Sequence, residues 1–271
     1  MLEFLTLLYH KGLSYSSINS AKSALASFVV IEGEFSLSNS PDVTRFMRGI
    51  FNLRTPKPKY SVTWDVNVVL EQLRLWFPHE NLTLKELTLK TVTMVALTSG
   101  LRAQSIHDMD LDCMSCTADY FLFTFTKPAK QEKAGKRRNS LKLFKFQEGS
   151  LDVHSLISCY IGKTAELRNS RKFWISFRKP HVSVGRQTIS RWLKSVLNKC
   201  GIDTTTFSPH STRMASTSKA CSVGVGLTGI LKTAGWANAK NFHKFYLRGQ
   251  AEEPEEDSRT FSEGVLLDFK N

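Results

Sequence analysis

Apolar residues recur three and four positions apart through most of the chain, and this spacing predicts a mainly α-helical protein. In the first 53 residues we expect a helix over about residues 1–11, closed by Gly12, a second from about Ser14 and a third from Ser40. The second helix carries one inward stripe, formed by Ile18, Ala21, Leu25 and Phe28. Together these helices predict a small N-terminal unit.

The third of these helices has the clearest start signal. Ser40 is a capping residue, and Pro41 suits the first helical position, where no amide hydrogen is needed. The residues expected to point inward are Val43, Phe46, Met47 and Ile50. This leaves Arg45 and Arg48 on the outward face.

A proline-containing basic stretch, residues 54–61, interrupts the helical pattern and has little to bury, so we predict an extended linker there. The linker divides the chain into a helical unit over residues 1–53 and a main domain over residues 62–250. Residues 251–271 form an acidic tail.

The main domain mixes helical and strand signals. Helices are predicted over about 65–77, 83–100, 152–167 and 185–200, the second opened by a capping box of Thr83 and Glu86. The aromatic-rich stretches 120–126 and 141–146 predict a hairpin, and 173–177 a short strand. The predicted class is therefore α+β, mainly α-helical, with a small antiparallel sheet.

The last of these helices is strongly amphipathic. Its inward positions are Ile189, Trp192, Leu193, Val196 and Leu197, and its outward positions are Arg186, Arg191, Lys194 and Lys199. A helix of this kind packs on a core with one face and offers cations to a partner with the other.

Charge narrows the choice of partner. The formal net charge is +13, and residues 127–145 contain eight Lys or Arg side chains and one acid, Glu132. Clustered cations release counterions from a polyanion, so nucleic acid is the expected partner. The alternative, that the charge serves only solubility, fits this uneven distribution less well.

Other classes of protein are less consistent with the sequence. No apolar run is long enough to span a bilayer and no secretion signal is evident, so we expect an intracellular protein that does not enter a membrane. The five cysteines are scattered and odd in number, which favours reduced thiols. Cys113 and Cys116 form a CxxC pair without further ligands at zinc spacing, so no metal or cofactor is predicted.

A phosphate-binding signal lies near the C-terminal end of the main domain. Ser208-Pro209 predicts a helix start, which places His210 and Arg213 on the first turn, three apart and on one face. The amides of a helix N-terminus attract anions, and an imidazole and a guanidinium would add to them. Alone, a His-x-x-Arg pair is more often a satisfied histidine and a surface arginine.

Three further blocks accompany it, and with them the chain resembles the tyrosine recombinase (phage integrase) family. Thr98-Ser99-Gly100-Leu101-Arg102 resembles the block of the first catalytic arginine, and Lys127 matches the hairpin lysine. His210-Ser211-Thr212-Arg213 matches the His-x-x-Arg box, and Ala234-Gly235-Trp236 followed by Tyr246 matches the last block. The resemblance spans about residues 62–250 and implies the tyrosine-recombinase catalytic fold.

The resemblance implies a role for each matched residue. Arg102 and Arg213 would stabilise charge on a scissile phosphate, and Tyr246 would be the nucleophile. Lys127 would protonate the leaving oxygen, His210 would orient the phosphate and shuttle a proton, and Trp236 would donate its indole N–H. Lys130 stays an alternative to Lys127, and Trp236 and Tyr246 have core packing as an alternative role.

Duplex DNA is the implied partner, with self-association into a dimer or tetramer on it. The residues expected to contact DNA are basic and outward-facing or in the hairpin loop: Arg45, Arg48, Lys130, Lys136, Arg137, Arg138, Arg186 and Arg191. Residues 1–53 resemble part of the family's helical core-binding domain. Ser105 stands where the family often has an acidic residue, so support for Arg102 must come from elsewhere.

Within the family, the motifs Ala-Gly-Trp-Ala-Asn and Lys-Phe-Tyr most resemble those of recombinases from eukaryotic mobile elements, particularly DIRS-type retrotransposons. That resemblance implies a nuclear protein. Two other functions stay open: a catalytically silent DNA-binding protein derived from such an element, and a DNA-relaxing topoisomerase of the same chemistry.

Overall fold

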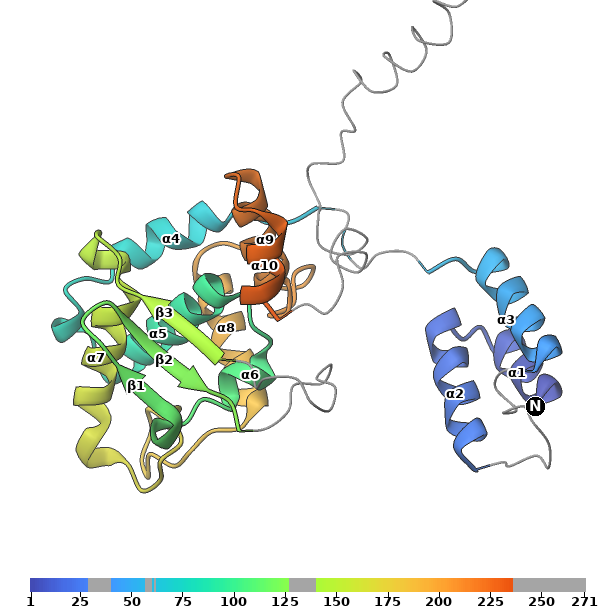
Figure 1. The fold of residues 1–271 in the computed structure, drawn as a ribbon, viewed down its shortest axis with the longest axis horizontal. Helices are drawn as coiled ribbons and strands as arrows, with labels where there is room; N and C mark the ends of the chain where they lie inside the picture. Colours follow the sequence, from blue (N-terminus) through green and yellow to red (C-terminus); the bar gives the residue numbers. More distant parts are fainter. Residues whose placement is uncertain (29–39, 57–59, 61, 127–139, 236–271) are drawn as a thin grey trace, which may run out of the picture. The chain divides into compact units, whose positions relative to one another are not determined.

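The computed structural model describes residues 1–28, 40–56, 60, 62–126 and 140–235. The chain divides into two units, residues 1–59 and 60–271 (Figure 1). The described residues of each unit form a separate hydrophobic core. The division between Lys59 and Tyr60 falls inside the stretch 54–61 that the sequence marks as a linker. No helix in the described ranges is long and apolar enough to cross a membrane.

The N-terminal unit consists of α1 (Leu2–His10), α2 (Tyr15–Phe28) and α3 (Pro41–Leu53). Its core contains Leu5, Ile18, Val43, Met47 and Ile50. The Ser40 cap is confirmed, because its hydroxyl accepts a hydrogen bond from the Val43 amide at 3.3 Å. Arg45 and Arg48 are exposed, as predicted.

One residue of the predicted inward stripe does not face the core. Phe28 is 87% exposed, whereas Ile18 on the same helix is fully buried. Phe28 is the last residue of α2, about 15 Å along the helix axis from Ile18 at the usual rise per residue. The small core around Ile18 does not extend that far.

The second unit is built around one central helix, α5 (Leu84–Ser99), which contacts strand β3 and four helices. The other α-helices are α4 (Val66–Arg74), α6 (Ala103–His107), α7 (Val153–Thr164), α8 (Arg186–Lys199), α9 (Ser211–Ser222) and α10 (Leu227–Thr233). Short 3-10 turns are η2 (His79–Asn81), η3 (Leu111–Cys113), η4 (Gly149–Leu151) and η5 (Ala165–Leu167). The capping box of Thr83 and Glu86 is present at the start of α5.

The sheet is three-stranded and antiparallel within the described ranges, in the order β1 (Met114–Cys116), β2 (Tyr120–Thr124) and β3 (Ser140–Phe144) (Figure 1). Phe121 pairs with Leu143 and Phe123 with Leu141, and these four side chains are buried. The predicted hairpin and the mainly helical α+β class are confirmed. The sequence analysis did not predict β1, because this strand has only three paired residues and so short a strand leaves no clear alternating pattern.

The predicted strand over 173–177 is wrong. Within this described segment a single isolated bridge is formed, between Ile175 and Ser183. Phe173, Trp174 and Ile175 are all at most 1% exposed, so their side chains do not alternate between a core face and a solvent face. The indole of Trp174 donates to the Ile106 carbonyl at 2.7 Å, which ties the segment to α6.

The amphipathic helix is confirmed as α8. Its five inward residues are buried in the main core, and Arg186, Arg191, Lys194 and Lys199 are exposed. The five cysteines, all inside the described ranges, are free thiols.

Candidate active site

The candidate site forms around the first turn of α9. The helix begins at Ser211, and the turn before it is closed by the Ser211 amide, which donates to the Ser208 carbonyl at 2.8 Å. His210 is the residue just before the helix and is exposed, whereas Arg213 is only 2% exposed. The two residues therefore lie on one turn but differ strongly in burial.

Arg213 joins segments that are far apart in the sequence. Its Nη1 donates to the carbonyl of Gly100 and to the carbonyl of Ala234, both at 2.5 Å. Gly100 lies two residues before Arg102, and Ala234 lies two residues before Trp236. The buried guanidinium thus joins the segments around residues 100, 213 and 234.

Gly100 makes this approach possible. It ends α5 with φ +58°, a left-handed conformation that glycine adopts without strain. A Cβ at this position would lie 3.2 Å from Ala234 Cβ and 3.3 Å from Thr217 Cγ2. The absence of a side chain therefore lets the end of α5 pack directly against α9 and the residue after α10.

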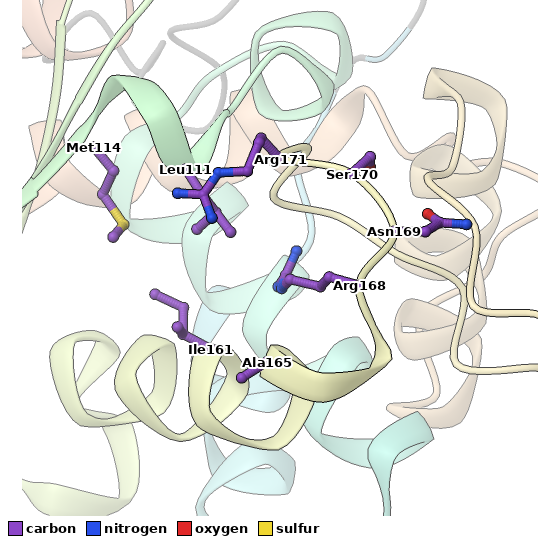
Figure 2. Close-up of a pocket in the computed structure, with 8 residues that line it drawn as sticks. All are labelled: Leu111, Met114, Ile161, Ala165, Arg168, Asn169, Ser170 and Arg171. Atoms are coloured by element: carbon purple, nitrogen blue, oxygen red, sulfur yellow. The ribbon is translucent and has the colours of Figure 1, made fainter.

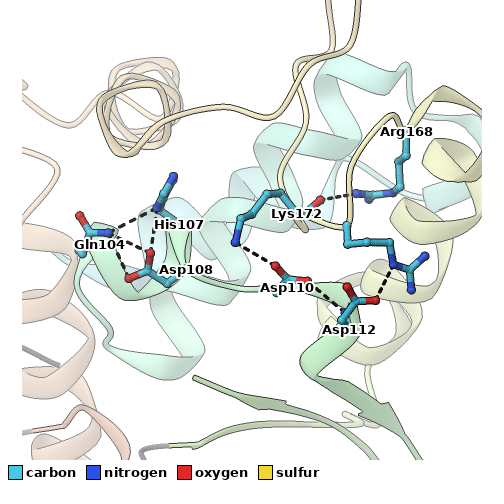
Figure 3. Close-up of polar contacts among 8 residues, drawn as sticks. Gln104, His107, Asp108, Asp110, Asp112, Arg168 and Lys172 are labelled. Carbon is cyan, nitrogen blue, oxygen red and sulfur yellow. Dashed lines mark hydrogen bonds and ion pairs between the residues drawn. The ribbon is translucent and has the colours of Figure 1, made fainter. Parts of the chain in front are cut away.

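Arg102 precedes α6 and is partly exposed. Polar contacts on α6 and the segments that follow hold this region in place (Figure 3). The Gln104 amide donates to both carboxylate oxygens of Asp108, at 3.0 and 3.1 Å. Lys172 donates to Asp110 at 2.9 Å, and this hydrogen bond raises the pKa of the Lys172 ammonium. These contacts hold α6, which begins directly after Arg102, and the segment that follows α6.

Several predicted site residues lie outside the described ranges. These are Lys127, Lys130, Lys136, Arg137, Arg138, Trp236 and Tyr246. Of the predicted DNA contacts, Arg45 and Arg48 lie on α3, and Arg186 and Arg191 lie on α8, all exposed.

A separate cleft of about 520 Å³ does not include any predicted site residue (Figure 2). It is lined by Leu111, Met114, Ile161, Ala165, Arg168, Asn169, Ser170 and Arg171. Its two arginines already have partners, since Arg171 pairs with Asp112 at 2.7 Å and Arg168 donates to the Lys172 carbonyl at 2.7 Å. We assign the candidate site to the Arg213 region rather than to this cleft.

No group of three or more His, Cys, Asp or Glu side chains that could hold a metal ion occurs in the ranges that the structure describes.

The sequence analysis missed two residues that contact the α9 turn. The Tyr60 hydroxyl lies 2.7 Å from Ser208 Oγ, and the Trp64 indole donates to Ser211 Oγ at 2.9 Å. Both contacts span almost 150 residues of sequence, so no local signal could have revealed them.

Comparison with known proteins supports a family assignment for the chain. Residues 75–253, more than half of the chain, match the Phage integrase family. A search of curated proteins found no match.

Solved structures share the fold at low identity. XerH site-specific recombinase bound to palindromic difH substrate matches with a TM-score of 0.64 and 13% identity, over 96% of this chain and 71% of that one. The Tn1549 transposon integrase bound to transposon right end DNA matches with a TM-score of 0.60 and 14% identity, over 97% of this chain and 84% of that one. A lambda integrase(75-356) dimer bound to a COC' core site matches with a TM-score of 0.52 and 13% identity, over 93% of this chain and 80% of that one.

Proposed function

The chain belongs to the phage integrase family of tyrosine recombinases, and we propose that it cleaves and rejoins DNA through a 3'-phosphotyrosyl intermediate during site-specific recombination. The observation that carries this proposal is the double hydrogen bond from Arg213 to the Gly100 and Ala234 carbonyls. It assembles three of the family's blocks around one cation. A protein that only bound DNA would have no need of this assembly together with Tyr246.

In the proposed cleavage step, the Tyr246 oxygen attacks the phosphorus of the scissile phosphodiester. A P–O bond forms to tyrosine, the bond from phosphorus to the 5'-oxygen breaks, and the phenol proton passes to the His210 imidazole, which shuttles it to solvent. Arg102 and Arg213 stabilise the negative charge that builds on the non-bridging oxygens. This is the task that a metal ion performs in other nucleases, so we propose that no metal is needed.

The leaving 5'-oxygen takes a proton from Lys127, for which Lys130 is the alternative donor. His210 orients the phosphate, and Trp236 donates its indole N–H to it. A 5'-hydroxyl of a second strand then attacks the phosphotyrosyl phosphorus, which releases Tyr246. Each step exchanges one phosphoester bond for another, so the reaction requires no ATP.

Two sets of exposed arginines support DNA contact away from the scissile phosphate. Arg45 and Arg48 lie on α3 of the N-terminal unit, which we propose is a partial core-binding domain. Arg186 and Arg191 lie on α8. Cations of this kind attract the phosphate backbone and fix the register of the protein on the duplex.

We propose that the protein acts as an assembly of two or four copies on DNA. Its structural neighbour, the lambda integrase(75-356), is a dimer bound to a core site. The tail over residues 251–271 contains Phe261, Val265, Leu266 and Leu267, apolar residues that suit docking on another copy.

We further propose that the protein comes from a eukaryotic mobile element of the DIRS retrotransposon type and works in the nucleus. The support is the sequence around Trp236 and Tyr246, Ala-Gly-Trp-Ala-Asn and Lys-Phe-Tyr. Recombination assays with candidate element termini, compared with unrelated bacterial sites, test this origin; a preference for the bacterial sites contradicts it.

The decisive experiment incubates the full chain, without magnesium, with nicked suicide duplexes that carry candidate element termini. We expect a covalent protein–DNA adduct on denaturing gels for the wild type and none for Tyr246→Phe. DNA binding without an adduct would instead support a catalytically silent DNA-binding protein.

A further inference from the structure

We propose that Tyr60 and Trp64 are positioning residues for the strand-transfer site, because they hold the turn that carries His210 and Arg213. This inference rests on the proposed function. It concerns the stretch where the chain enters the second unit, since Tyr60 is the first residue of that unit.

The first contact is made by Tyr60. Its hydroxyl accepts a hydrogen bond from the Ser208 amide at 3.1 Å and lies 2.7 Å from Ser208 Oγ. Its ring packs at a centroid distance of 5.6 Å from Phe207. One side chain thus fixes both the backbone and the side chain of Ser208, two residues before His210.

The second contact is buried. The Trp64 indole donates to Ser211 Oγ at 2.9 Å, and the two residues are 6% and 1% exposed. Ser211 is the first residue of α9 and stands between His210 and Arg213 in the sequence. A buried hydrogen bond of this kind holds its partners firmly, because breaking it leaves polar atoms without water.

The start of α9 is not held by a side-chain cap from the residue before it. His210 occupies the cap position and its side chain makes no capping hydrogen bond. Most helix starts are fixed by such a local contact. Here Tyr60 contacts Ser208, two residues before His210, and Trp64 contacts Ser211, directly after it; both contacts span almost 150 residues of sequence.

The consequence for catalysis follows from geometry. Arg213 is fixed at its guanidinium by the carbonyls of Gly100 and Ala234, and the turn before it is fixed by Tyr60 and Trp64. Phosphate-binding groups that shift by a fraction of an ångström lose much of their rate advantage while the DNA stays bound.

The test uses full-length Tyr60→Phe and Trp64→Phe, with Tyr120→Phe on β2 as the matched control. Single-turnover cleavage of the nicked suicide duplex is measured at saturating protein, beside DNA affinity and urea unfolding. We expect cleavage to slow about 10-fold to 100-fold, with DNA affinity within about twofold and Tyr120→Phe unchanged. Unchanged cleavage overturns the proposal, and so does a loss of cleavage that merely follows a loss of affinity or stability.

A double-mutant cycle identifies the route. If Tyr60 acts through Ser208, the double variant Tyr60→Phe with Ser208→Ala should cleave DNA at the same rate as whichever single variant cleaves more slowly. Additive slowing would mean that Tyr60 acts by another route and would overturn the assignment. The same cycle applies to Trp64 and Ser211.

Wild-type enzyme in the same assay separates the two proposals. A missing wild-type adduct contradicts the proposed function, whereas an adduct that the variants do not slow contradicts only the positioning role. Amide hydrogen exchange over residues 207–214 tests the positioning contacts even without cleavage. We expect faster exchange there in both variants and unchanged exchange in α7; unchanged exchange over 207–214 overturns the proposal.

Discussion

Lys90 is a lysine in an unusual place, the fully buried interior of α5. Its ammonium donates to the Trp76 carbonyl, and burial lowers its pKa from the ordinary 10.5 to about 8. The nearby His79 is also buried, and burial together with the Lys90 charge lowers the pKa of its imidazole. The charged Lys90 is therefore a cost to the fold at neutral pH.

We expect Lys90→Met to stabilise the protein at pH 7 by about 1–2 kcal/mol. The pKa shift corresponds to a penalty of about 3 kcal/mol, and the lost hydrogen bond to Trp76 offsets about 1 kcal/mol of the gain. Urea unfolding measures the difference, with exposed Lys85→Met on the same helix as the control. A Lys90→Met variant less stable than wild type at pH 7 contradicts this account.

The advantage of Lys90→Met should shrink as the pH rises from about 8 to 10.5. In this window the folded protein releases the Lys90 proton and the unfolded chain keeps it, so the wild type gains stability with pH. Below pH 8 both states are protonated and the full penalty remains. Urea unfolding of the wild type and Lys90→Met at pH 7 and pH 10 tests whether the difference in unfolding free energy shrinks as the pH rises.

Gly100 is the residue on which the assembly of the site depends most directly. Gly100→Ala introduces strain at positive φ and brings a methyl group within 3.2 Å of Ala234 Cβ. We expect a loss of about 2–3 kcal/mol in unfolding free energy and much slower DNA cleavage. Gly201→Ala is the matched control, since its φ is +77° and no atom lies within 4 Å of the new methyl. Equal losses in the two variants would rule out the close-packing argument.

At the scale of elements, the start of α7 depends on one carboxylate. Asp152 is 3% exposed and accepts hydrogen bonds from the amides of His154 and Ser155, at 3.0 and 3.2 Å. It also accepts from the Phe146 amide at 2.9 Å, which ties the helix to the segment after β3. The same side chain thus caps a helix and fixes its position beside the sheet.

Asp152→Ala is expected to destabilise the protein by about 2–4 kcal/mol, because three backbone amides lose their acceptor. Asp65→Ala is the comparison, since Asp65 is exposed and caps α4 by accepting from the Asn67 amide at 2.9 Å. The unfolding free energy of Asp65→Ala should fall by about 0.5–1 kcal/mol. Thermal or urea unfolding of the two measures the difference, and equal losses would contradict the bridging role.

At the scale of the whole molecule, the net charge of +13 predicts DNA binding that weakens steeply with salt. Replacing Arg186 and Arg191 by Gln should reduce the slope of log affinity against log salt by up to about 2, since each phosphate contact contributes about 0.9. Arg74→Gln with Arg171→Gln changes the net charge equally but removes arginines paired with Glu148 and Asp112. Fluorescence anisotropy should show little change in slope for this control; equal slopes for both pairs would exclude α8 from the interface.

The tail after residue 254 gives a second prediction at this scale. Deleting residues 255–271 should weaken assembly of several copies on DNA more than it weakens single-site cleavage, because the segment's apolar residues suit docking on another copy. Native gel shifts and suicide-substrate cleavage measure the two effects. Equal loss of both would argue against a docking role.

The sequence by itself determined the features that depend on neighbouring residues. The caps of α3 and α5, the buried face of α8 and the pairing of β2 with β3 follow from signals within a few positions. The blocks of the candidate site were also found from sequence, because the family resemblance lies in short motifs.

Tertiary structure decided how those blocks meet. Arg213 and Gly100 are 113 positions apart, and no periodicity encodes their hydrogen bond. The burial of Lys90 and the isolated bridge that replaces the predicted strand at 173–177 depend on which elements surround them. The contacts of Tyr60 and Trp64 with the α9 turn are of the same kind. Local spacing determines which side chains lie on one face of an element, whereas long-range packing determines which other elements that face contacts. The candidate site depends on both.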